Sequence, residues 1–199
     1  MISNSIPECP TFVTHLECSD TGVNYPADQV HGLSASGRPL LVKYDLEGLG
    51  RAISKQDLLT RNADIWRYRE FLPVRKKANI VSLGEMMTPI LPLTNVAKKL
   101  GLNKDVLWVK DEGRLPTGSF KARGLVMAVS MAKELGIKRI AMPTNGNAGA
   151  ALSAYCTQAG IEIYVFCPQD TPDINIQETC LQGGKVFRVN GLINDCGKL

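Results

Sequence analysis

LPTGSFKARG, residues 115–124, is the stretch around which the rest of the chain is organised. The apolar run 106–110 before it predicts a strand, and the apolar residues 125–135 after it predict a helix. Between these two elements, Pro116 and Gly118 favour a turn. Proline fixes the backbone angle φ at a value common in turns, and glycine permits the positive φ that many turns need. The stretch therefore predicts a strand, a tight turn and the start of a helix.

Lys121 has an unusual chemical position in this pattern. Ser119 occupies the place expected of a helix N-cap, which puts Lys121 in the first helical turn. A helix N-terminus carries partial positive charge, so a half-buried ammonium there is pushed toward the neutral amine. A neutral lysine amine is the nucleophile that forms Schiff bases with aldehydes. A solvated lysine without such a role explains the ten residues equally well.

A second candidate site is the stretch Thr144–Gly149, which reads TNGNAG. It follows a predicted strand at 139–142 and opens a predicted helix at 147–159 rich in small residues. In parallel sheets, ligands bind where strands end and helices begin, and free backbone amides there suit a carboxylate or phosphate. An ordinary turn between strand and helix is the simpler alternative for this stretch taken alone.

The C-terminal part of the chain alternates regularly between strand and helix patterns. Strands are predicted at 139–142, 162–167 and 185–189, and helices at 147–159 and 173–182. Strand–helix–strand alternation of this kind indicates βαβ units and a parallel sheet flanked by helices. We therefore expect an α/β fold.

The middle of the chain has weaker patterns. Apolar residues recur with roughly helical spacing over 51–72, and Pro73 ends this predicted helix. The segment 81–92 is expected to be a strand and loop, followed by a short amphipathic helix over 93–100 that stops at Gly101.

The first 50 residues form a separate small β element by prediction, with strands at 12–16 and 40–44. Two of its turns resemble a zinc knuckle in which only one of four cysteine positions is kept. One thiolate cannot make a tetrahedral metal site, so no metal is expected, and a mixed site with a histidine is the less favoured alternative. The four knuckle positions and the two histidines are Cys18, Thr21, Ser34, Ser36, His15 and His31.

The composition is ordinary for a globular protein: 199 residues, 44% hydrophobic, with a net charge of +4. Basic residues are scattered, with one run of three at 75–77, which weighs against a nucleic-acid partner. No apolar run approaches membrane-spanning length, so no membrane partner is expected. The six cysteines form no C-x-x-C pair, which favours a reducing, cytoplasmic setting.

Several stretches together resemble the fold-type II pyridoxal-phosphate enzymes, the class with a tryptophan synthase β-like fold. They are the lysine stretch, the loop 144–149, and SLGEMMTP at Ser82–Pro89. The stretches WRYRE at Trp66–Glu70 and GRPLLVKYDL at Gly37–Leu46 are similar to the threonine synthases within that class. The resemblance extends from about Leu16 to Leu199.

The resemblance implies roles for individual residues and a cofactor, pyridoxal 5'-phosphate. Lys121 would be the Schiff-base lysine and proton carrier, Phe120 would pack near the cofactor ring, and Asn147 would hydrogen-bond the phenolic oxygen. The loop after the strand would hold the α-carboxylate of a small amino-acid substrate through Thr144, Asn145 and Gly146. No metal is implied. The cofactor would act as the electron sink, with the protein supplying orientation and proton transfer.

The reaction implied is the conversion of O-phospho-L-homoserine and water to L-threonine and phosphate. Three departures from the family pattern, Leu115, Ala122 and Met86, keep alternatives open within the same chemistry. These are threonine or serine dehydration and a cysteate-synthase-like β-replacement. A dinucleotide-binding or non-enzymatic module is a third reading, disfavoured because residues 146–149 lack the first glycine of G-x-G-x-x-G.

We expect residues 51–199 to be the N-terminal part of the catalytic domain, with its C-terminal part absent. In the family, a glycine-rich phosphate loop and the partner of the ring nitrogen come from that other half, and no glycine cluster here suits the phosphate. The 199 residues alone are therefore expected to bind the cofactor weakly, to be inactive, and to expose apolar surface. A homodimer is expected for the complete enzyme.

Overall fold

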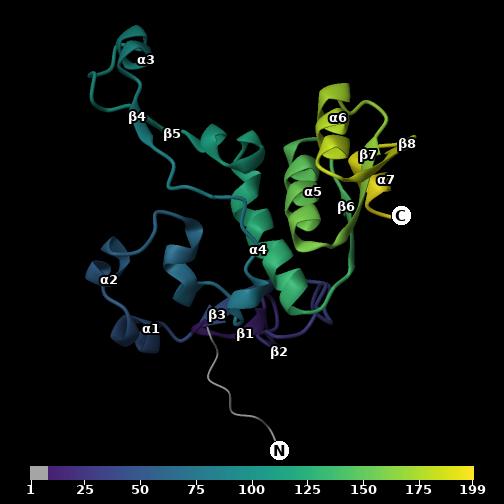
Figure 1. Ribbon diagram of the computed structural model, residues 1–199, viewed down its shortest axis with the longest axis horizontal. Helices are drawn as coiled ribbons and strands as arrows, with labels where there is room; N and C mark the ends of the chain where they lie inside the picture. Colours follow the sequence, from purple (N-terminus) through teal and green to yellow (C-terminus); the bar gives the residue numbers. More distant parts are fainter. Residues whose placement is uncertain (1–8) are drawn as a thin grey trace, which may run out of the picture.

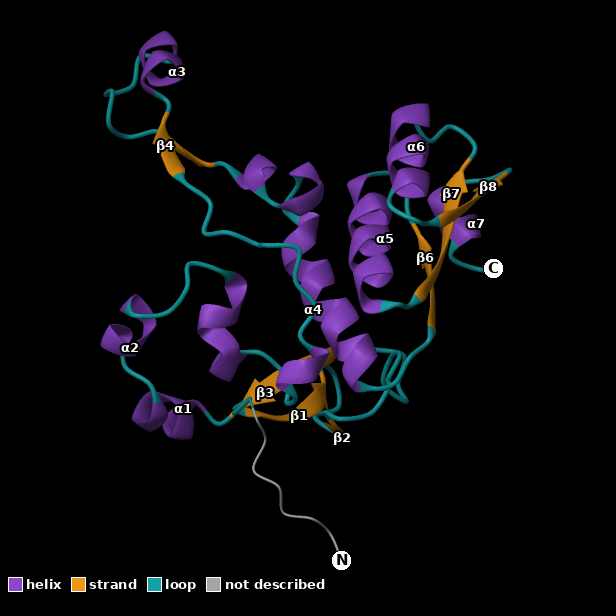
Figure 2. Ribbon diagram, in the orientation of Figure 1, coloured by secondary structure: helices purple, strands orange, loops and turns teal. Residues whose placement is uncertain are grey.

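The computed structural model describes residues 9–199, so the first eight residues of the predicted N-terminal element lie outside the described part. Three regions follow one another along the chain (Figure 1): a small antiparallel sheet, a middle region of short helices with a projecting hairpin, and a parallel sheet with helices. The predicted α/β fold with a parallel sheet and flanking helices is confirmed (Figure 2).

The N-terminal sheet contains β1 (Val13–Cys18), β2 (Asn24–Pro26) and β3 (Leu40–Tyr44) in the order β2-β1-β3. Both neighbours of β1 are antiparallel to it. The two strands predicted here are confirmed, whereas the three-residue β2 carries too short a pattern to be recognised in the sequence.

The predicted single helix over 51–72 is wrong. The structure has three pieces instead: α1 (Leu46–Ala52), α2 (Lys55–Leu59) and the 3-10 helix η1 (Ile65–Phe71). Local polar contacts explain the first break, between α1 and α2, because Ser54 and Asp57 form a reciprocal capping box that starts a new helix after the extended residue Ile53. The helical spacing of apolar residues is preserved across the pieces, which is what misled the prediction.

The middle region continues with the 3-10 turn η2 (Lys77–Asn79) and then projects from the rest of the molecule as a hairpin (Figure 1). Strands β4 (Ile90–Pro92) and β5 (Trp108–Lys110) are antiparallel and enclose α3 (Thr94–Lys99). The strand predicted at 106–110 is thus present, but it belongs to this two-stranded ribbon and not to the parallel sheet. All six strand residues are exposed.

The parallel sheet has the order β6-β7-β8, formed by Arg139–Pro143, Glu162–Pro168 and Lys185–Val189. Both strand pairs are parallel, as the βαβ pattern predicts. The helices are α4 (Lys121–Glu134), α5 (Asn147–Ala159), α6 (Asp173–Leu181) and the short α7 (Ile193–Cys196). These bounds agree with the predicted strands and helices of this part of the chain.

The hydrophobic core lies between α4, α5 and β7. Its members are fully or almost fully buried and include Val126 and Val129 from α4, Leu152 and Tyr155 from α5, and Val165 from β7. Alternate residues of β7 point into this core, which fits a strand packed against helices on one face. The core therefore holds α4 and α5 together, and both candidate site stretches lie at the starts of these helices.

The four knuckle positions of the N-terminal element meet at one point in the structure. The Cys18 sulfur lies 3.2 Å from the Ser34 hydroxyl and 3.3 Å from the Ser36 hydroxyl, and the Thr21 amide donates to it at 3.4 Å. Cys18 is buried. The hydrogen bond with Ser34, followed by those with Ser36 and Thr21, lowers the pKa of the Cys18 thiol to about 6, while burial acts in the opposite direction. Among residues 9–199, no cluster of three histidine, cysteine or acidic side chains is placed to hold a metal.

We predict that Cys18 contributes a pH-dependent part of folding stability. A thiol whose pKa is lowered on folding stabilises the native state above its unfolded pKa of about 9, and that contribution is lost as the pH falls through about 6. The stability difference between the parent and Cys18→Ala, measured by chemical denaturation, should therefore shrink as the pH is lowered across this window. A difference that stays constant with pH would show that Cys18 remains a protonated thiol.

Candidate active site

The turn before Lys121 has a strained backbone. The short 3-10 turn η4 (Pro116–Gly118) contains Thr117 at φ 58°, a left-handed conformation that is unusual for a β-branched residue, and Gly118 at φ 65°. The Thr117 hydroxyl donates to the Pro116 carbonyl at 2.6 Å. The sequence indicates a turn here but not this strain, since nothing in the residue types points to threonine at positive φ.

The predicted N-cap role of Ser119 is wrong. Helix α4 begins at Lys121, Phe120 is its N-cap residue, and no side chain caps the first amides. The Ser119 hydroxyl is instead buried, and no hydrogen-bond partner is found for it among the described residues. A buried hydroxyl in this state is a donor and acceptor available to a neighbouring group.

Lys121 lies in the first turn of α4, as predicted, but it is exposed and not half-buried. Its ammonium nitrogen lies 4.7 Å from the centre of the Phe120 ring. Phe120 is itself 59% exposed. The expectation of a half-buried amine is therefore not met by the described residues, because no segment of residues 9–199 covers this face of the helix start. An accessible amine beside an exposed aromatic ring is the arrangement that the structure provides.

The second stretch forms the turn from β6 into α5. The Thr144 amide donates to the Phe166 carbonyl at 2.9 Å, which fixes the turn to the neighbouring strand, and the Gly146 amide donates to the Thr144 hydroxyl at 3.3 Å. Asn145 and Asn147 are exposed, and Asn147 is the first residue of α5. The Asn147 side-chain oxygen accepts a hydrogen bond from Asn175 at 3.3 Å.

The fold brings the two stretches to the same end of the molecule. Helices α4 and α5 pack side by side and run in the same direction (Figure 1), and η4 contacts α5. The helix starts that carry Lys121 and Asn147 therefore point the same way. No side chain caps either start, and the partial positive charge of both helix N-termini faces the same side. This arrangement suits a ligand that joins an aldehyde to an anionic group.

Gly149 is required where α5 passes the Thr144 turn. A methyl group at this position would lie 2.9 Å from the Thr144 side chain, 3.0 Å from Thr179 and 3.4 Å from Val165. Such contacts are closer than packing allows, so a larger residue would displace the Thr144 turn.

We predict that Gly149→Ala destabilises the protein by about 1–3 kcal/mol through this overpacking. Gly124→Ala is the matched control, because a methyl group at this position of α4 would meet no other atom within 4 Å. That change should stabilise the helix by about 0.5–1 kcal/mol. Urea denaturation measures both, and equal effects of the two substitutions would contradict the packing argument.

A polar cluster missed in the sequence holds the start of α4. The Glu112 carboxylate accepts from both Nε and Nη2 of Arg123, the latter at 2.8 Å, and from the Thr88 hydroxyl at 2.5 Å. Arg123 Nη2 also donates to the Thr88 hydroxyl at 3.1 Å. The cluster joins the loop after Met87, the turn η3 (Glu112–Arg114) and α4. No spacing signal could have revealed it, since its members lie up to 35 positions apart.

The Glu112 carboxyl titrates at an unusually low pH. Its hydrogen bonds with Arg123, and then with Thr88, lower its pKa to about 2 against the opposing effect of burial. Because the folded pKa lies below the ordinary value of 4.5, Glu112 stabilises the native state above about pH 4.5, and this contribution is lost as the pH falls toward 2.

We therefore predict that Glu112→Gln costs about 1.5–3 kcal/mol at neutral pH, the range for a hydrogen bond to a charged group. The loss should diminish as the pH is lowered through the window above. Glu47→Gln is the control, because Glu47 is 88% exposed and its ion pair with Arg51 spans 3.7 Å. If both variants lost the same stability at neutral pH, the cluster would not hold the helix start.

A cleft of about 240 Å³ lies beside this cluster. Its lining includes Tyr68, Met86, Met87, Lys110 and Arg123. The cleft thus adjoins the second residue after Lys121, and Asp64 adds a carboxylate to its basic and apolar lining.

Comparison with known proteins identifies the family of the chain. A family model described as a pyridoxal-phosphate dependent enzyme matches residues 81–199, more than half of the chain. The chain belongs to this family, which confirms the predicted membership.

Three of the relatives found are named threonine synthase. The one from Methanocaldococcus jannaschii is 35% identical over 179 residues, and the one from Methanosarcina acetivorans is 34% identical over 183 residues. These alignments cover 89% and 91% of this chain but 44% of each relative. A third, from Halalkalibacterium halodurans, is 40% identical over 125 residues, which cover 62% of this chain and 34% of the relative.

Among solved structures, diaminopropionate ammonia lyase from Escherichia coli in complex with an aminoacrylate-PLP azomethine intermediate has a similar fold. The TM-score is 0.53 at 20% sequence identity, covering 59% of this chain and 33% of that chain. This similarity supports the fold class and, at such low identity, nothing finer.

Pyridoxal phosphate fits the residues present on the lysine side of the site. Lys121 offers an accessible amine, Phe120 an exposed ring beside it, and Ser119 a buried hydroxyl without a partner among the described residues. The amine can react with the aldehyde of pyridoxal phosphate, the Phe120 ring can pack near its aromatic ring, and the Ser119 hydroxyl can hydrogen-bond one of its polar substituents.

Proposed function

We propose that the chain is the N-terminal part of a threonine synthase, a lyase that converts O-phospho-L-homoserine and water to L-threonine and phosphate. The observation that carries the proposal is the accessible Lys121 amine at the start of α4, in a chain 35% identical to a threonine synthase over nearly its whole length. Since the chain spans 44% of that relative's length, the activity is proposed for the complete protein.

We propose the following roles. Lys121 and Asn147 would hold the cofactor, with Phe120 beside its ring, and Lys121 would carry protons to and from the substrate carbons. The substrate α-carboxylate would be bound at the start of α5 by Thr144, Asn145 and Gly146. When bound, pyridoxal phosphate supplies an electron sink that acidifies the substrate Cα–H. The chain's own contribution is to orient the substrate and to transfer protons at Nζ of Lys121.

A dehydratase acting on threonine or serine, or a β-replacement enzyme, would use the same residues. The discriminating experiment measures phosphate release from O-phospho-L-homoserine beside keto-acid formation from threonine, with the full-length enzyme. Phosphate release accompanied by threonine supports the synthase. Keto acid as the dominant product would assign the dehydratase instead.

We predict that Lys121→Ala abolishes activity and that Lys121→Arg fails equally, because a guanidinium stays protonated and cannot condense with an aldehyde. Borohydride reduction of the parent enzyme should attach the cofactor covalently to the peptide that contains Lys121, as peptide mass spectrometry can verify. Lys138→Ala is the control, since Lys138 is exposed on the loop before β6. Turnover by Lys121→Ala at the parent rate would sink the assignment.

We also propose that residues 1–50 form an N-terminal β element and residues 51–199 the beginning of the catalytic domain. A reducing, cytoplasmic setting is supported by the thiols Cys18, Cys156, Cys167, Cys180 and Cys196, which are all unlinked. Within residues 9–199, no helix has the length and apolar character to cross a membrane. A homodimer remains our expectation for the complete enzyme.

A further inference from the structure

A second cleft lies away from Lys121. It has a volume of about 540 Å³, within the range typical of metabolite sites. Its walls come from Cys9 and Pro10, from the loop after α2, from η1 and from the turn at Lys77–Ile80. It shares no residue with the lysine stretch or with the Thr144 turn.

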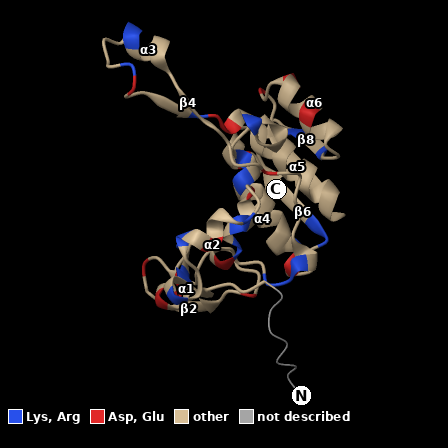
Figure 3. Ribbon diagram, turned by 60° about the vertical axis from the view of Figure 1, so that its left-hand side comes forward, with Lys and Arg blue, Asp and Glu red and all other residues tan. Residues whose placement is uncertain are grey.

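Basic residues outnumber acidic residues in the walls of this cleft. Four basic residues face one carboxylate in its walls: Arg61, Arg67, Arg69 and Lys77 against Asp64. Figure 3 shows basic residues spread over much of the chain, and four of them line this cleft. A cleft with excess positive charge raises the local concentration of anions.

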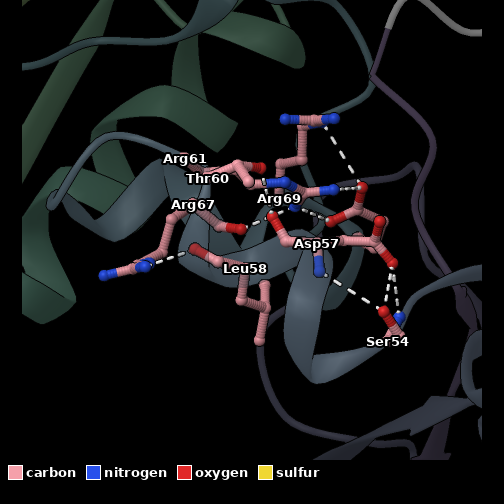
Figure 4. A network of polar contacts seen from close by, with 8 residues as sticks. Ser54, Asp57, Leu58, Thr60, Arg61, Arg67 and Arg69 are labelled. Carbon is pink, nitrogen blue, oxygen red and sulfur yellow. Dashed lines mark hydrogen bonds and ion pairs between the residues drawn. The ribbon is translucent and has the colours of Figure 1, made fainter.

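Part of this charge is already neutralised within the protein. Arg61 binds both carboxylate oxygens of Glu70, at 2.7 and 2.8 Å, and Arg69 lies 3.4 Å from the same carboxylate. Figure 4 shows Arg61 and Arg69 in this network. One buried carboxylate thus serves two guanidinium groups, which leaves positive charge in excess.

Arg67 makes the strongest case for a missing anion. It is nine-tenths buried, and no carboxylate of the described residues pairs with it. Its hydrogen-bond acceptors are neutral: the Leu58 carbonyl, toward which Figure 4 shows it extending, and the Met87 sulfur at 3.9 Å. A buried charge is costly unless it is paired, so this guanidinium favours an added anion.

Two further donors beside the cleft lack acceptors among the described residues. They are Nε of Arg67 and Nε1 of Trp66, both fully enclosed. Buried donors without an acceptor are rare in folded proteins. Trp66 also lines the cleft and offers an aromatic wall.

We propose that this cleft binds a small oxyanion, such as the phosphate or carboxylate group of a metabolite, as a second site separate from the lysine site. Guanidinium groups, such as those of Arg67 and Arg69, donate in a planar fork that phosphates and carboxylates both match, and the exposed Lys77 adds a further positive charge to the lining. The site goes beyond the proposed reaction, because none of the residues given catalytic or substrate-binding roles contributes to it.

The test uses the full chain with Trp108→Phe, which leaves Trp66 as the only tryptophan. Inorganic phosphate and succinate are titrated separately at low ionic strength, with Trp66 fluorescence as the readout and calorimetry as a second measurement. We expect a saturable change with at least one of the two anions, and the anion that binds more tightly identifies the class of oxyanion. No saturable change with either anion overturns the proposal.

Lys77→Gln should weaken binding about fivefold, the scale of one exposed charge, and Arg69→Gln with Lys77→Gln should weaken it more than about tenfold. Lys76→Gln is the matched control, since Lys76 is the exposed neighbour of Lys77 and does not line the cleft. The anion affinity of the Lys76→Gln variant should stay within about twofold of that of the parent. An equal loss in Lys76→Gln and Lys77→Gln would overturn the assignment, because the effect would then be non-specific charge.

Lys121→Ala separates this proposal from the proposed function. That variant should keep the full affinity for the oxyanion while losing the enzyme activity. If Lys121→Ala lost the anion affinity as well, the ligand would be at the lysine site and the second site would be refuted. The anion titration needs no turnover. Its result therefore tests the second site even if the enzyme proves to catalyse a dehydration.

Discussion

The packing of α4 against α5 is the contact on which the arrangement of the site depends. Ala122 on α4 is fully buried in the core between these elements, and its small side chain allows a close approach of the two helices. Larger side chains, among them Val126, Val129 and Tyr155, then fill the space against β7. Because the two helices are parallel neighbours, their N-termini face the same side, and two stretches about 25 residues apart in the sequence become one site.

Buried polar contacts tie this helix pair to the segment before it. The Tyr155 hydroxyl donates to Glu85 at 2.5 Å, and Glu85 also accepts from the Leu83 amide and the Ser82 hydroxyl. The Val81 amide donates to Ser130 on α4 at 3.0 Å. Burial, followed by the hydrogen bond to Glu85, raises the pKa of Tyr155, so the phenol stays protonated as the donor. A fully satisfied buried network fixes one arrangement, so residues 81–85 set the position of both helices.

The sequence predicted secondary structure well where a regular pattern of apolar residues extends over many positions. The strands and helices from 139 to 189 follow a clear βαβ alternation, and their predicted bounds agree with the structure within one or two residues. The sequence was misleading where short polar contacts decide, as at the capping box of Ser54, which divides a helix whose apolar spacing continues unbroken.

In the candidate site, too, local features could be predicted from the sequence and features that depend on tertiary contacts could not. The position of Lys121 in a first helical turn follows from local turn signals and could be predicted. Its exposure could not, because burial depends on which distant segment covers the helix start. The partners of Glu112 and the strain at Thr117 were likewise invisible, since each arises from tertiary contacts or backbone geometry and not from a motif.

The electrostatics of the start of α4 explain how a helix can begin with two cations. Lys121 and Arg123 both lie in its first turn, no acidic residue accompanies them there, and no side chain caps the amides. Such a start is unfavourable beside the positive end of the helix dipole. Glu112, supplied by the preceding turn, provides the missing negative charge, yet its oxygens are taken by Arg123 and Thr88. The arginine is thereby held in a structural ion pair, while the Lys121 amine makes no ion pair with any described residue and stays available for chemistry.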